Sequence, residues 1–190
     1  MAQGRTFGII DTISTWLMRL VVINILWIGT TLAGLVVFGI GPATTASFIK
    51  IRGYLTGEKV SYVEAVRRYF LRSVLFSWIL LLVGAILVVD YYFLFRWESS
   101  LANVFIGLAF FFTIFYLVVV AYGFIYISEG RTIKEAIKQS VIYFLRKPSM
   151  VITGLMSIVI GGFIISQLAV LLLFFSFSLG AVILALTFGK

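Results

Sequence analysis

The feature that most constrains this chain is a set of four long stretches that carry almost no charge. They are Leu20–Phe48, Ser73–Phe95, Leu101–Ile127 and Met150–Gly189, and Asp90 is the one charged side chain within them. A helix that crosses a membrane needs about 20 apolar residues. Because 62% of the residues are hydrophobic and only 12% are charged, the chain has too little polar surface for a soluble domain. The sequence therefore predicts an all-α, polytopic membrane helical bundle.

The number of spans follows from the lengths of these stretches. Met150–Gly189 would form roughly 60 Å of helix, twice the thickness of a hydrocarbon core, so we expect two spans that turn within Ser166–Ser178. Leu20–Phe48 is long for one span, and Gly39-Ile40-Gly41-Pro42 predicts a break within it. A short second helix would then run from about Ala43 to Leu55. We expect six spans, and five spans remain the alternative.

The basic residues set the expected orientation. They gather in two polar links, Lys50–Arg72 and Arg131–Lys147, whereas the opposite link, Arg96–Ser100, has no excess of positive charge. The positive-inside rule places the two basic links in the cytoplasm, and six spans place both termini there too. One membrane domain over residues 1–190 would then comprise an interfacial segment (1–19), a broken hairpin (20–57), a cytoplasmic amphipathic helix (58–72), a second hairpin (73–127), a second such helix (128–148) and a third hairpin (149–190).

The two basic links share a sequence pattern. Ser61 precedes Glu64 by three residues and Thr132 precedes Glu135 in the same way, which predicts a capping box at the start of a helix in each link. Both links continue with an alanine, an aliphatic residue and a basic residue, and later with Tyr-Phe-Leu-Arg. Internal duplication and convergence both account for this likeness.

Seven basic side chains in these links are candidate contacts. Their role is either to meet anionic lipid of the inner leaflet or to dock a cytoplasmic or membrane partner. A second copy of the chain is also a possible partner, and no nucleic acid is expected. The candidates are Arg67, Arg68, Arg72, Lys134, Lys138, Arg146 and Lys147.

A few polar or helix-breaking residues inside the apolar stretches are candidates for a structural or functional role. Irregular backbone at membrane depth is tolerated only in protein or beside water, so Gly41, Pro42 and Thr44 mark either a functional element or a tight turn. Asn24 would form an interhelical hydrogen bond or contact a substrate. Asp90 lies near the outer boundary of its span, where a functional role and simple hydration are both open.

The composition also narrows the chemistry. The chain has no cysteine and no histidine, so thiolate nucleophiles, cysteine-bound metal centres and imidazole acid–base catalysis are excluded. No constellation of the remaining polar residues indicates a nucleophile with its base. We expect a non-enzymatic protein without a catalytic site, cofactor or metal.

Several short motifs in the first half resemble one protein family. Asn24-Ile25-Leu26-Trp27, Gly41-Pro42-Ala43-Thr44, Gly57-Glu58 and Asp90 occur in this order. Together they resemble the YesL family of small bacterial membrane proteins. The second half matches that family mainly in its pattern of spans, and Gly34 and Phe38-Gly39 depart from the family's usual residues before the turn.

The resemblance implies a function only by association. The YesL family is a domain of unknown function, often encoded beside ATP-binding-cassette (ABC) carbohydrate uptake systems. It therefore implies an accessory subunit that contacts the permease or ATPase subunits of such an importer, and it assigns no ligand residue. A small solute transporter or channel that acts as an oligomer is the alternative, because broken helices and repeats are typical of transporters.

Overall fold

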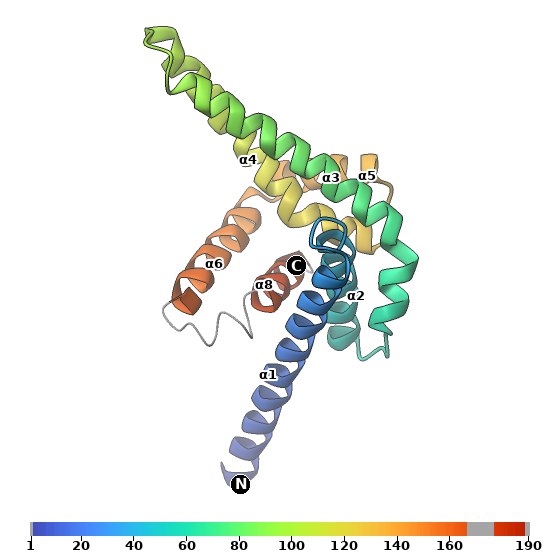
Figure 1. Cartoon of the computed structure of the whole chain (residues 1–190). Coiled ribbons are helices and arrows are strands. Elements are labelled where there is room, and N and C mark those ends of the chain that lie inside the picture. Colours follow the sequence, from blue (N-terminus) through green and yellow to red (C-terminus); the bar gives the residue numbers. More distant parts are fainter. Residues whose placement is uncertain (1, 167–176, 189–190) are drawn as a thin grey trace.

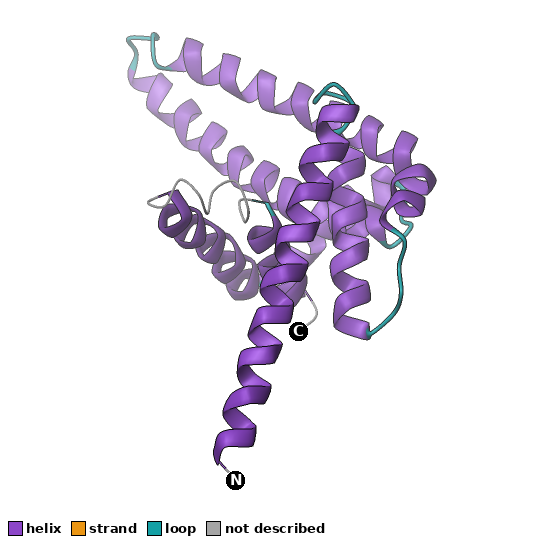
Figure 2. Ribbon diagram, turned by 60° about the horizontal axis from the view of Figure 1, so that its bottom comes forward, coloured by secondary structure: helices purple, strands orange, loops and turns teal. Residues whose placement is uncertain are grey.

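The computed structural model describes residues 2–166 and 177–188, which form helices and no strand (Figure 2). The prediction of an all-α fold is therefore confirmed for this part of the chain. The predicted turn within Ser166–Ser178 falls almost wholly outside it, as does Gly189. The described helices are α1 (Ala2–Ala33), α2 (Ile40–Thr56), α3 (Tyr62–Leu94), α4 (Ser100–Ser128), α5 (Ile133–Arg146), α6 (Pro148–Ser166) and α8 (Ser178–Phe188).

Three of these helices are long and apolar enough to cross a membrane. The qualifying segments are Ser14–Ala33 in α1, Tyr62–Leu94 in α3 and Leu101–Ser128 in α4. A fourth span results only if α5 and α6, which meet at a bend of 105°, are counted as one. Six spans are thus not confirmed, because α2 has 17 residues and α8 has 11, both short of a full crossing.

The break in the first hairpin lies earlier than the sequence indicated. Residues 34–39 form the turn, and Leu35 and Val36 take left-handed conformations with φ of 51° and 66°. Gly41, Pro42 and Thr44 are helical residues of α2 and do not belong to the break. Pro42 is accommodated because the first turn of a helix has no internal acceptors for its N–H groups, so the missing donor costs nothing there.

Two expected segment boundaries are absent from the structure. Residues 1–19 were expected to form a separate interfacial segment, yet α1 runs unbroken from Ala2 to Ala33. Residues 58–72 were expected to form a helix distinct from the following span, yet α3 runs unbroken from Tyr62 to Leu94. No proline lies in either helix, so nothing in the backbone chemistry forces a stop where the polarity changes.

The second basic link does form a separate helix. α5 ends at Arg146 because Pro148 follows and the preceding residue, Lys147, is held in a non-helical conformation (φ −134°, ψ 58°). Ala136 and Ser140 on α5 are buried against the core, whereas Leu145 near the end of the helix is exposed.

The core surrounds the second half of α4, which contacts α2, α3, α5 and α8. Tyr122 and Ile127 of α4 are fully buried there, as is Phe76 of α3, whose ring lies where a side chain at Gly123 would be. The other halves of α3 and α4 form an antiparallel hairpin that extends away from the remaining helices, with residues 95–99 at its tip (Figure 1). The structure therefore has a packed end and a projecting hairpin.

Candidate functional site

Three of the candidate residues, Gly41, Pro42 and Thr44, lie in one buried junction between α1, α2 and α3. Thr44 is 7% exposed, and its hydroxyl accepts a hydrogen bond of 3.1 Å from the Trp27 indole N–H. One residue on, the hydroxyls of Thr45 and Ser73 are 2.8 Å apart and bonded. These polar groups are buried and have protein partners, which is the arrangement of a structural polar network.

Gly41 and Pro42 allow the close packing of this junction. A side-chain carbon at Gly41 would lie 2.2 Å from Ser77 Oγ and 2.3 Å from the backbone oxygen of Ser73, so only glycine fits. Pro42 is fully buried beside it. Sequence reasoning did not single out Ser73 and Ser77. The sequence feature that could have identified them is the spacing of two hydroxyl side chains, four residues apart, on one face of an apolar helix.

Asn24 links the N-terminal helix to the C-terminal part of the chain. Its side chain is 0% exposed, and its Oδ1 accepts a hydrogen bond of 3.2 Å from the backbone N–H of Phe177. The Phe177 ring also stacks on Trp27, with centroids 4.6 Å apart. The hydrogen bond therefore joins α1 to the residue that precedes α8.

Asp90 lies apart from this junction. It is an exposed residue near the tip of the α3–α4 hairpin, where it lines an open groove together with Arg96, Trp97 and Phe105. The Trp97 and Phe105 rings stack at 5.7 Å, and the Arg96 guanidinium lies 4.1 Å from the Tyr92 ring centre. Aromatic and amphipathic side chains of this kind are typical of a membrane interface.

The basic candidates of the two links meet in a second groove, at the packed end. Arg67, Arg68 and Arg72 of α3 line it from one side and Lys134 of α5 from the other. The groove is open, with a volume of about 1060 Å³, and apolar residues complete its lining: Phe70, Leu71, Leu75 and Ile133. We call this feature the basic groove.

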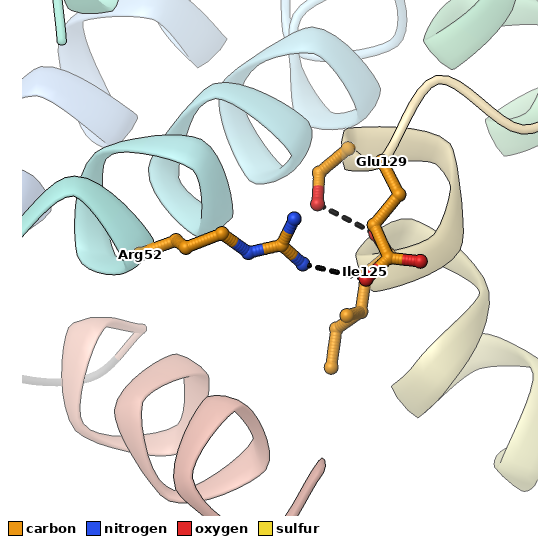
Figure 3. Close-up of polar contacts among 4 residues, drawn as sticks. Arg52, Ile125 and Glu129 are labelled. Carbon is orange, nitrogen blue, oxygen red and sulfur yellow. Dashed lines mark hydrogen bonds and ion pairs between the residues drawn. The ribbon is translucent and has the colours of Figure 1, made fainter. Parts of the chain in front are cut away.

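Two arginines join the basic links to each other. Arg72 Nη1 donates hydrogen bonds to the backbone oxygens of Gly130 (2.7 Å) and Arg131 (3.1 Å), which follow α4. Arg52 of α2 forms an ion pair of 2.9 Å with Glu129, whose backbone N–H is bonded to Ile125 (Figure 3). Arg72 thus satisfies two backbone carbonyls in the loop that follows α4, and Arg52 binds the carboxylate of the residue that caps the end of α4. Both basic links lie at one end of the protein.

The remaining basic candidates lie on α5 outside the basic groove. Lys138 and Arg146 are exposed, and Lys147 is the half-buried residue that ends the helix. The predicted capping box is present at Thr132, whose hydroxyl accepts from the Glu135 N–H while Glu135 accepts from the Thr132 N–H. These bonds hold the pKa of the Glu135 carboxyl below its ordinary value. Hence α5 has a fixed start at neutral pH.

The comparisons with known proteins bear on the half of the chain that holds the junction. Residues 20–91 match the model of a family described as "Protein of unknown function, DUF624". Together with the two relatives described next, this match confirms the resemblance to YesL-like proteins. It covers the junction, the α3 side of the basic groove and Asp90, and leaves α5 outside.

Two curated relatives are similar to the chain, both from Bacillus subtilis (strain 168). "Uncharacterized protein YteU" is 34% identical over 95 residues, which are 47% of this chain and 43% of YteU. "Uncharacterized protein YesL" is 50% identical over 52 residues, which are 27% of this chain and 25% of YesL. The chain thus aligns with less than half the length of either relative. No solved structure matches the chain significantly.

The described residues offer no set of metal ligands. Within residues 2–166 and 177–188, no three His, Cys, Asp or Glu side chains are close enough to hold an ion. The chemistry that the arrangement does provide is cationic and apolar: the basic groove, and the exposed basic side chains of α5.

Proposed function

We propose that this chain is a non-enzymatic, multi-pass protein of the bacterial cell membrane that acts as an accessory subunit of an ABC-type carbohydrate importer. The observation that carries the proposal is the exposed basic surface of α5, which the capping box and the contacts of Arg72 hold beside the packed end. Arginine and lysine side chains on a rigid helix suit the recognition of acidic groups on a cytoplasmic partner.

The partner in this proposal is a permease or ATPase subunit of the importer. The link to carbohydrate uptake comes from the YesL-like resemblance of residues 20–91 and from nothing in the geometry. The basic end would face the cytoplasm, in accord with the positive-inside rule, and both termini would lie there if the chain crosses six times.

Solute transport by the chain itself has less support. A transporter needs polar groups that face a passage at membrane depth. The polar groups of the junction are instead buried and bonded to one another, as for Thr45 with Ser73 and Trp27 with Thr44. This arrangement favours a packing role for the broken hairpin.

Co-purification tests the accessory role. A tagged copy is expressed in its native bacterium, extracted in a mild detergent that keeps a known ABC importer assembled, and analysed by mass spectrometry. We expect permease or ATPase subunits to be recovered with the wild-type protein. Lys138→Glu should lower their recovery at least fivefold, whereas Arg96→Glu, the same charge reversal at the hairpin tip, should change it less than twofold. Recovery of the chain without importer subunits would contradict the proposal.

A further inference from the structure

The basic groove differs from a general basic surface in its position along α3. Its three arginines lie in the polar N-terminal part of α3, just before the apolar stretch begins at Ser73; they are Arg67, Arg68 and Arg72. The groove therefore straddles the boundary between polar and apolar sequence, which is the level of lipid headgroups for a helix that enters a bilayer.

Among the described residues, no carboxylate lines the basic groove, although Glu64 lies one turn before Arg68 on α3 and Glu135 follows Lys134 on α5. Glu129 is paired with Arg52, and Glu135 is bonded to the backbone at the start of α5. The Arg52–Glu129 pair is the one ion pair found among residues 2–166 and 177–188, and it lies outside the groove. Arg67 and Arg68 on α3 are exposed, and Lys134 of α5 lines the other side of the groove. These three side chains form a cationic pocket that is suited to bind an anion.

An exposed apolar strip continues from the groove along α3. Leu71, Leu75, Trp78 and Leu82 follow one another at intervals of four, three and four residues, so they lie on one face of the helix. Their exposed fractions are 69%, 49%, 46% and 62%. The strip covers roughly 16 Å of helix, close to the ~15 Å of hydrocarbon in one leaflet.

From these observations we infer that the basic groove is a binding site for a single anionic phospholipid. Its phosphate lies between Arg67, Arg68 and Lys134, and its acyl chains lie along Leu71, Leu75, Trp78 and Leu82. Guanidinium and ammonium groups are suited to phosphate oxygens. Arg72 stays bonded to Gly130 and Arg131 and shapes the wall of the groove. The site does not depend on the accessory role proposed above.

Native mass spectrometry of the detergent-solubilised full chain tests this inference. The probes are dioleoyl phosphatidylglycerol and dioleoyl phosphatidylcholine, added at equal concentration. We expect one phosphatidylglycerol to be retained per chain and at least fivefold less phosphatidylcholine. Equal retention of the two lipids would overturn the inference, because the site would then recognise the acyl chains and not the charge of the headgroup.

Matched variants separate a defined site from diffuse attraction. Arg67→Gln/Arg68→Gln/Lys134→Gln should lower phosphatidylglycerol retention at least fivefold. Lys59→Gln/Lys138→Gln/Arg146→Gln removes the same charge outside the groove and should change it less than twofold. Equal losses in the two variants would overturn the site. The single variant Arg68→Gln, at an exposed position, gives the same comparison against Lys138→Gln if the triple variant fails to fold.

Two further arms distinguish a lipid from other anions. Leu71→Ser/Leu75→Ser keeps every charge, and it should weaken retention of dioleoyl phosphatidylglycerol at least threefold because the acyl chains lose their surface. Inorganic phosphate at 100-fold excess over the lipid should leave retention unchanged. Displacement of the lipid by inorganic phosphate, or full retention by the leucine variant, would show a plain phosphate site and contradict the inference.

Discussion

Gly41→Ala is the sharpest test of the junction between α2 and α3. The added carbon would lie 2.3 Å from the Ser73 backbone oxygen, whereas ordinary contacts begin at 3.4 Å, so the two helices must separate by about 1 Å. Ser77 Oγ can rotate away, but the Ser73 carbonyl is part of a helix and cannot. Overpacking of this kind costs about 1–3 kcal/mol, and alanine returns at most about 1 kcal/mol of helix propensity. We expect a net loss of roughly 1–2 kcal/mol.

Gly107→Ala is the matched control for this experiment. Gly107 lies within α4, and a side chain there would meet nothing within 4 Å, so the same substitution should stabilise the protein by up to about 1 kcal/mol. The free energy of unfolding of both variants is measured in mixed micelles titrated with a denaturing detergent. Equal shifts in the two variants, or a stabilised Gly41→Ala, would refute the close approach of α2 to α3.

Three further substitutions test other contacts by the same unfolding measurement. Arg52→Gln should cost less than about 1 kcal/mol, because its ion pair with Glu129 is partly exposed, and a loss above about 2 kcal/mol would contradict this. Thr132→Ala removes the cap of α5 and should cost about 1 kcal/mol; an unchanged stability would mean that the cap is not formed. Asn24→Leu leaves the partly buried backbone N–H of Phe177 without its acceptor and should cost about 1–3 kcal/mol, whereas Asp90→Asn, at an exposed position, should stay within about 0.5 kcal/mol. A larger loss for Asp90→Asn than for Asn24→Leu would contradict the burial of Asn24 and the exposure of Asp90.

The fold class and the start of α5 were predictable because local chemistry determines them. Long apolar stretches have few stable alternatives to helices in a membrane, and Thr132 with Glu135 forms the box that the spacing indicated. The junction was predictable only in part. Gly41 and Thr44 were singled out, but the groups that explain them, the Ser73 carbonyl and the Trp27 indole, come from other helices.

The helix boundaries were less predictable because tertiary packing sets them. Gly39 and Gly41 predicted a break, yet the residues in left-handed conformations are Leu35 and Val36. Gly39 instead permits a close approach of the chain to α1, because a Cβ atom at this position would lie 2.5 Å from the Thr31 backbone oxygen. In α3, the polar N-terminal residues and the apolar span that follows form one continuous helix, although the change in polarity predicted a boundary between them. At the end of α5, by contrast, Pro148 gave a stop that local chemistry enforces.

We propose that both basic links lie at the same face of the membrane. The chain has no cysteine, so single cysteines at Lys59, Lys138 and Ser99 can be labelled one at a time with a membrane-impermeant maleimide. We expect labelling of Lys59→Cys and Lys138→Cys in inside-out vesicles only, and of Ser99→Cys in intact protoplasts only. Labelling of Lys59→Cys and Lys138→Cys from opposite sides would contradict it.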